Sequence, residues 1–183
     1  MKIWKLWEDV NNYDSLMAKD SNFEHEFEAL NGCSLIEGWE PIELKRMYGE
    51  GLPLSDYPYF FGRPVMSDKA ISALDSIIRD SVEYLSLAFE EKNYTMVNIT
   101  KILNVIDYEK AEYETFPNSK KILAFEKYKF RTCDELLTSD IFKLIDEPRR
   151  NPFVSDRFKK YVEENKLTGF KFELVWDSEA EIE

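Results

Sequence analysis

The sequence predicts a single α+β domain, in which a mainly antiparallel sheet carries two capped amphipathic helices. Three observations support this fold class. Short runs rich in Val, Ile, Thr and aromatic residues are typical of strands, and several of them alternate apolar with polar positions. Two serines each precede an apolar stripe with helical spacing. Strands and helices do not alternate regularly along the chain, which argues against a doubly wound α/β protein.

The first predicted helix follows Ser67 in the stretch PVMSDKAISAL. The hydroxyl of Ser67 can accept a hydrogen bond from an early helical N–H, and the carboxylate of Asp68 suits the positive first turn. Ile71, Leu74 and Ile78 then recur on one helical face. We expect this apolar face to pack on the sheet.

The second predicted helix follows Ser155 and echoes the first, because Ser155 can cap it and Asp156 follows. Gly169 can supply the positive φ of a tight turn, and a strand comes after it. The polar tail after Asp177 is expected to fray. In this closing segment we expect the following side chains in the core: Phe158, Tyr161, Phe170, Phe172, Leu174 and Trp176.

Four further strands follow from local patterns. Lys2 to Trp7 is rich in aromatic residues and is predicted as an edge strand. Ile42 and Leu44 alternate with charged residues, as in a half-buried strand. Val82 to Phe89 is apolar on both faces and is predicted as a central strand, with Tyr94 to Asp107 as its antiparallel return.

Three other regions carry weaker signals. Glycine and proline residues cluster between residues 49 and 64, which predicts a long structured loop rather than a domain boundary. Residues 11–31 are polar and weakly periodic, so no element is predicted there. Tyr128 and Phe130 alternate with basic residues, which predicts one dry and one wet strand face. Four aromatic residues of the loop are expected to be buried: Tyr57, Tyr59, Phe60 and Phe61.

The chain of 183 residues carries 36 acidic and 24 basic side chains, which gives a net charge of −12. An acidic chain repels phosphates, so we expect no nucleic acid partner, whereas a basic protein would be attracted. The acidity can equally serve solubility.

No apolar run approaches the roughly 20 residues of a membrane helix. The apolar run in the opening stretch MKIWKLWEDV is too short for a signal peptide, so a cytoplasmic location is expected.

No pattern in the sequence points to catalysis. The single histidine, His25, lies between two glutamates, and Cys33 and Cys133 have neither metal-ligand nor disulfide spacing. No glycine-rich nucleotide motif is present. We therefore expect a protein that is not an enzyme and that binds no cofactor and no metal.

Three stretches together resemble an immunity family of bacterial polymorphic toxin systems, the eleventh in the numbered series and formerly a domain of unknown function. The stretches are PVMSDKAISAL (Pro64–Leu74), YTMVNITKILNVID (Tyr94–Asp107) and FVSDRFKKYVEENKLTGFKFELVWD (Phe153–Asp177). On this basis a single immunity-type domain spans residues 1–183. Its family-like part is residues 63–177, preceded by a divergent part, 1–62, and followed by the tail, 178–183.

The resemblance implies a protein that binds and neutralises a cognate toxin, without a cofactor and without a catalytic residue to carry over. Two other classes stay open: a small hydrolase with an unrecognised carboxylate site, and a non-enzymatic scaffold or regulatory module. A basic toxin would be attracted by acidic surface. The candidate partner-binding residues form two clusters: Asp107, Glu109, Glu112 and Glu114, and, as a rival, Glu24, Glu26 and Glu28.

Overall fold

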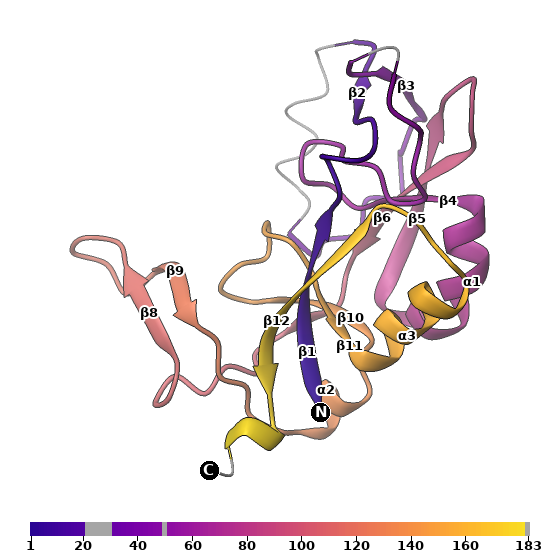
Figure 1. Ribbon diagram of the computed structural model, residues 1–183. Coiled ribbons are helices and arrows are strands. Elements are labelled where there is room, and N and C mark those ends of the chain that lie inside the picture. The colour runs from indigo at the N-terminus through magenta and orange to yellow at the C-terminus, as the bar shows by residue number, and fades with distance from the viewer. Residues whose placement is uncertain (21–30, 49–50, 182–183) are drawn as a thin grey trace.

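The computed structural model describes residues 1–20, 31–48 and 51–181 of the chain (Figure 1). The strands of these residues form two five-stranded sheets and a separate two-stranded hairpin. Two longer helices pack against each other beside the sheets. Most strand pairs are antiparallel, so the predicted α+β class with a mainly antiparallel arrangement is confirmed.

The first sheet has β1 in its interior. Its strand order is β12 (Phe170–Asp177), β1 (Lys2–Glu8), β11 (Phe153–Ser155), β10 (Ile141–Leu144) and β7 (Ile102–Leu103). The predicted edge position of Lys2 to Trp7 is therefore wrong, because β1 pairs antiparallel with both β11 and β12. Ile3 and Leu6 point to opposite faces of this strand and both are fully buried, as an interior strand requires.

The second sheet contains the predicted central strand. Its order is β2 (Leu16–Ala18), β3 (Ile42–Arg46), β5 (Val82–Ala88), β6 (Tyr94–Ile99) and β4 (Val65–Ser67). The alternation of Ile42 and Leu44 in β3 is confirmed, since both are buried between exposed neighbours. Strand β6 returns antiparallel to β5, also as predicted.

The predicted return strand does not extend to Asp107. It ends at Ile99, where the N–H groups of Thr100 and Lys101 both donate to the carbonyl of Ser81. The chain then crosses to the first sheet, where β7 pairs parallel with β10. The apolar pattern continues past Ile99 because the second stretch is buried in a different cluster, not because the strand continues.

The hairpin of β8 (Glu112–Thr115) and β9 (Ile122–Lys127) extends away from both sheets (Figure 1). The remaining elements are short: α2 (Asp134–Leu137), η2 (Arg79–Ser81) and η3 (Glu179–Glu181). The expected fraying after Asp177 is wrong for Ser178, whose N–H donates to the carbonyl of Met1 at 2.9 Å and whose hydroxyl accepts from the Met1 amino group at 2.7 Å.

Helix α1 (Asp68–Ile78) is capped as predicted, since the Ser67 hydroxyl accepts from the N–H of Ala70 at 3.3 Å. The same hydroxyl donates to the buried carboxylate of Asp56 at 2.7 Å, and the Ser67 N–H donates to the Asp56 carbonyl at 3.0 Å. Lys69, two residues after the cap, pairs with that carboxylate at 3.7 Å. The start of α1 is thus bound to Asp56, in the loop that precedes the helix.

Helix α3 (Asp156–Glu164) begins with the same set of bonds. The Ser155 hydroxyl accepts from the N–H of Phe158 at 3.1 Å and donates to the buried carboxylate of Asp140 at 2.5 Å. The Ser155 N–H donates to the Asp140 carbonyl at 3.2 Å. Arg157, again two residues after the cap, donates through Nε to both carboxylate oxygens at 3.0 Å. The similarity of the two stretches in the sequence therefore reflects one capping arrangement used twice.

A central cluster of apolar side chains joins the two sheets. Leu6 and Val154 from the first sheet meet Val97 from the second, together with Leu74 of α1 and Phe158 of α3. A second cluster lies on the other face of the first sheet, and a third packs on the second sheet. Because the central cluster draws on both sheets and both helices, they form one packed unit.

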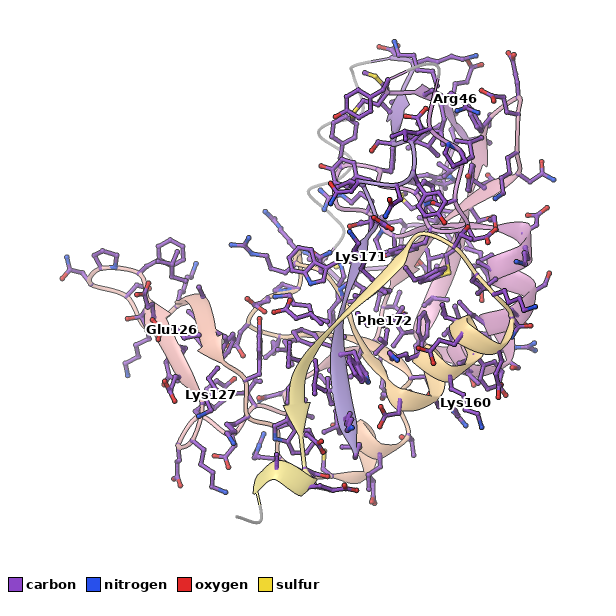
Figure 2. All side chains as sticks on the ribbon, viewed as in Figure 1. Arg46, Glu126, Lys127, Lys160, Lys171 and Phe172 are labelled. Atoms are coloured by element: carbon purple, nitrogen blue, oxygen red, sulfur yellow. The ribbon has the colours of Figure 1, made fainter. Side chains whose placement is uncertain are left out.

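The predicted core face of β12 is only partly right. Phe170, Phe172 and Tyr161 are half-buried against the central cluster, and Figure 2 shows Phe172 beside α3. Leu174 is 46% exposed, which corrects its predicted burial. The strand has a bulge: Ile3 pairs with Trp176 but Trp4 pairs with Leu174, which leaves one extra residue on β12. The bulge turns Trp176, 5% exposed, into the second cluster.

The long loop before α1 is structured, as predicted. Tyr57 and Phe60 are fully buried and Tyr59 is half-buried. Phe61 was expected in the core but is 46% exposed. It has a φ of 50°, in the left-handed region, at a turn with Gly62, and the turn directs its side chain outward.

Replacing Trp176 by alanine should lower the free energy of unfolding by about 3–5 kcal/mol, because it leaves a cavity in the second cluster. The matched change Leu174→Ala on the same strand should cost less than about 1 kcal/mol, since that side chain is largely in water. Urea unfolding of both variants measures the difference. Equal losses would show that the bulge does not separate the two positions.

Ser67→Ala and Ser155→Ala should each cost about 1–2 kcal/mol, because each removes an N-cap acceptor and a donor to a buried carboxylate. Ser72→Ala, at an exposed position inside α1, is the control and should be neutral or slightly stabilising. Thermal unfolding followed by circular dichroism measures all three. Unchanged midpoints for both cap variants would contradict the assigned role of the serines.

Candidate partner-binding surface

The first predicted acidic cluster lies at the start of the hairpin. Glu112 and Glu114 are on β8, and Asp107 and Glu109 are in the turn before it. Asp107 is partly used within the chain: it accepts from the N–H of Glu109 at 3.3 Å and pairs with Lys110 at 3.4 Å. The four residues thus follow one another along the turn before β8 and along β8 itself.

Only part of this cluster is available to a partner. Glu112 pairs with Lys127 across the hairpin at 3.4 Å, with both side chains more than half exposed. Glu109 and Glu114 are exposed and their carboxylates make no ion pair with any side chain of the described residues. The rival cluster of Glu24, Glu26 and Glu28, and His25 among them, lies outside the described residues.

The hairpin also exposes large apolar side chains, which the sequence reasoning did not single out. All four residues of β8 are exposed, so this strand buries neither face. The exposed apolar residues of the hairpin and of the turns beside it are Tyr108, Tyr113, Phe116 and Leu123. For Tyr108 and Tyr113 the sequence did hold a signal, because each lies between two acidic residues, whereas Phe116 and Leu123 have no charged neighbour.

A row of aromatic rings connects the hairpin to the body. The ring of Tyr113 lies 5.8 Å from that of Phe125, Phe125 lies 5.0 Å from Tyr128, and Tyr128 lies 5.2 Å from the fully buried Phe153. Tyr128 and Phe130 are both buried, as predicted, but they do not belong to a strand, because β9 ends at Lys127. The row fixes the base of the hairpin, while its outer half remains free of the body (Figure 2).

A polar network reinforces the same base. The ammonium group of Lys5 donates to the hydroxyl of Tyr128 at 2.8 Å, and that hydroxyl donates to Glu147 at 2.8 Å. Lys5 and Glu147 also form an ion pair at 3.9 Å. Burial lowers the pKa of Lys5, and the negative charge of Glu147 opposes this shift. Burial raises the pKa of Tyr128, and Glu147 adds to the increase, so this tyrosine stays neutral.

The geometry of this network suits a structural role. The Lys5 side chain is only 13% exposed. Its ammonium group lies 5.2 Å from the ring centre of Tyr128 and 5.5 Å from that of Phe153, which stabilises the charged form. Lys5 links β1 to the hairpin and to the segment that carries Glu147.

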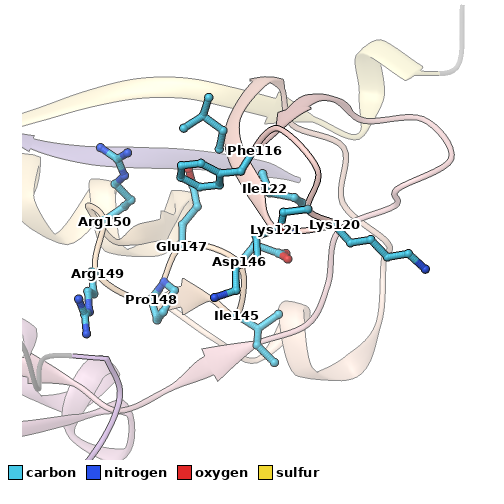
Figure 3. Close-up of a pocket in the computed structure, with 12 residues that line it drawn as sticks. Phe116, Lys120, Lys121, Ile122, Ile145, Asp146, Glu147, Pro148, Arg149 and Arg150 are labelled. Carbon is cyan, nitrogen blue, oxygen red and sulfur yellow. Dashed lines mark hydrogen bonds between the residues drawn. The ribbon is translucent and has the colours of Figure 1, made fainter.

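A groove of about 970 Å³ lies between the hairpin and the segment from Ile145 to Arg150 (Figure 3). The hairpin side is lined from Phe116 and from Ser119 to Leu123. The opposite side is formed by the turn that follows β10. The groove therefore has one wall that is part of the packed body and one wall that is the projecting hairpin.

A family model supplies the decisive comparison: the model of the immunity protein family Imm11 matches residues 12–177 of the 183. The chain belongs to this family. A search of curated proteins gave no match. The match begins at residue 12, so it includes most of the segment 1–62 that the sequence comparison set apart. The division of the chain at residue 62 stays a prediction.

Three other features of this Imm11 member concern metal ligands, thiols and helix length. Among the described residues no group of three or more His, Cys, Asp or Glu side chains is placed to hold a metal ion. Cys33 and Cys133 are both free thiols, one exposed and one half-buried. None of the helices in the described ranges has the length and apolar character needed to cross a bilayer.

Tyr128→Phe should destabilise this Imm11 member by about 1–3 kcal/mol, because it leaves Lys5 and Glu147 without the hydroxyl that bridges them. Tyr113→Phe is the matched control: no hydrogen bond of its hydroxyl is found within the described residues, so a change within about 0.5 kcal/mol is expected. Chemical denaturation measures both. A Tyr128→Phe protein as stable as the control would show that the network does not brace the hairpin.

Proposed function

We propose that this protein binds a cognate bacterial toxin and neutralises it by binding alone, without enzymatic activity of its own. The observation that carries the proposal is the projecting β8–β9 hairpin with its exposed aromatic side chains, in a chain that belongs to an immunity protein family. The action takes place in the cytoplasm, where the toxin would otherwise reach its target.

The hairpin has the properties of a binding element. Strands β8 and β9 pair only with each other within the described chain, and a lone two-stranded hairpin is marginally stable in water. Its outer residues add little to the core, yet three apolar side chains among them are exposed to solvent: Tyr113, Phe116 and Leu123. Aromatic residues are enriched in protein interfaces, so a partner that covers these side chains accounts for their exposure.

Charge gives the second argument. The net charge of −12 favours encounter with a basic protein, and Glu109 and Glu114 place unpaired carboxylates beside the exposed aromatic residues. Charged groups at the rim of an interface act mainly on the association rate, and salt screens this effect. A basic toxin, such as a nuclease, would be attracted to this side of the hairpin. The same acidity disfavours nucleic acid as a direct partner.

Reversal of Glu109, Glu112 and Glu114 to lysine should slow association with the toxin domain encoded beside this protein's gene several-fold at low salt. The effect should shrink at high salt, because screening removes long-range attraction. The same reversal of Glu24, Glu26 and Glu28 tests the rival cluster. Surface plasmon resonance at two salt concentrations measures the rates.

A reversal with the same change of net charge elsewhere is the control, at the exposed residues Glu37, Glu40 and Asp80. If all three triple variants slow association equally, only the total charge matters and neither cluster is the rim. If no variant changes the rate at any salt, electrostatic steering is wrong. Absence of any binding by the wild-type protein would remove the immunity function itself.

A further inference from the structure

We propose that the groove between the hairpin and the Ile145–Arg150 segment holds an acidic segment of the toxin that also carries an apolar side chain. This inference rests on the proposed function and assigns a partner chemistry to one part of its surface. It differs from the acidic cluster on β8, which would face basic residues of the same toxin.

The cations of the groove carry the inference. Four of its lining residues are basic, and none of their side chains pairs with a carboxylate of the described residues: Lys120, Lys121, Arg149 and Arg150. Figure 3 shows Arg149 and Arg150 at one end of the groove and the side chain of Lys120 extending outward at the other, so the positive charge lies at the rim of the groove. Such a concentration is unexpected in a chain with a net charge of −12.

The two acidic residues of the same lining offset only part of this positive charge, since they stand against four basic side chains. Asp146 accepts a hydrogen bond from the hydroxyl of Tyr108 at 2.7 Å. Glu147 accepts from Tyr128 and is paired with Lys5, and its side chain is only 9% exposed. Both carboxylates are thus held by groups of the chain itself. The charge left to an occupant is positive, and the complementary occupant is acidic.

The apolar part of the lining favours a peptide segment over a small inorganic anion. Phe116, Leu123 and Ile145 are exposed in the free protein, and all three line the groove. An inorganic anion would leave these side chains in water. A segment that combines carboxylates with a Leu, Phe or Trp would cover them and would pair with the cations around them. A volume of about 970 Å³ is large enough for several side chains.

Two electrostatic explanations of binding predict opposite results for the reversal of Arg149 and Arg150 to glutamate. One is general attraction of a basic toxin, and the other is pairing of the groove with carboxylates of the toxin. The reversal changes the net charge from −12 to −16, so general attraction of a basic toxin would become stronger. A groove that pairs with carboxylates would instead lose its partner and repel it. We expect the dissociation rate of the neighbour-encoded toxin domain to rise at least about tenfold, since lost contacts within an interface act on dissociation.

Three further variants sharpen the test. Lys120→Glu with Lys121→Glu should have a similar effect, and Leu123→Ala should raise the dissociation rate several-fold. The control is Lys45→Glu with Lys160→Glu, two exposed lysines outside the groove, which should change it less than about twofold. Unfolding midpoints of all variants confirm that the fold is kept.

The outcomes separate this inference from the proposed function. If the wild-type protein binds the toxin and Arg149→Glu with Arg150→Glu binds equally well or more tightly, the groove does not hold an acidic segment, although the immunity function stands. If the control pair weakens binding as much as the groove pairs, the assignment to the groove is also wrong. If the wild-type protein does not bind the toxin, both proposals are overturned together.

Discussion

The buried carboxylate of Asp56 joins elements of the two sheets, and the arrangement of these sheets depends on it. It accepts hydrogen bonds from Ser67 at the start of α1, from Lys92 in the β5–β6 turn and from Thr168 before β12. Burial alone would raise its pKa, but these bonds outweigh burial and hold the pKa below its ordinary value. Beside it, a Cβ on Gly169 would lie 2.4 Å from Ser55 Oγ, so only glycine allows this close approach.

The two helix caps were predictable from the sequence, but the more distant residues that bind the capping serines were not. Ser67 and Ser155 could be recognised as caps because a cap depends on three or four neighbouring residues. Their bonds to Asp56 and Asp140 depend on chain segments 11 and 15 residues away. The alternation on β12 predicted Leu174 and Trp176 on one face, but a bulge, which leaves no clear mark in one sequence, separates them. The continuous apolar pattern after Tyr94 likewise concealed a change of sheet at Ile99.

The candidate partner-binding surface was likewise only partly predictable from the sequence. The acidic cluster from Asp107 to Glu114 was visible as a run of charge, but its pairing with Lys110 and Lys127 was not. The groove was harder to foresee, because it joins Lys120 and Lys121 to Arg149 and Arg150 across a separation of about 30 residues. A functional surface that is made from two distant segments has no local signature. The family match shows which family the chain belongs to, and the exposed side chains of the hairpin support our proposal for its binding surface.

The central claim is that this immunity protein meets its toxin with the β8–β9 hairpin and the facing Ile145–Arg150 segment, while the capped helices only hold the fold. Amide hydrogen exchange of the protein, alone and with the neighbour-encoded toxin domain, tests this claim most directly. The account predicts new protection at residues 112–127 and 145–150, because a bound partner excludes water from those amides. It predicts unchanged exchange in α1 and α3. Protection confined to the helices or to the second sheet, with the hairpin exchanging as in the free protein, would contradict it.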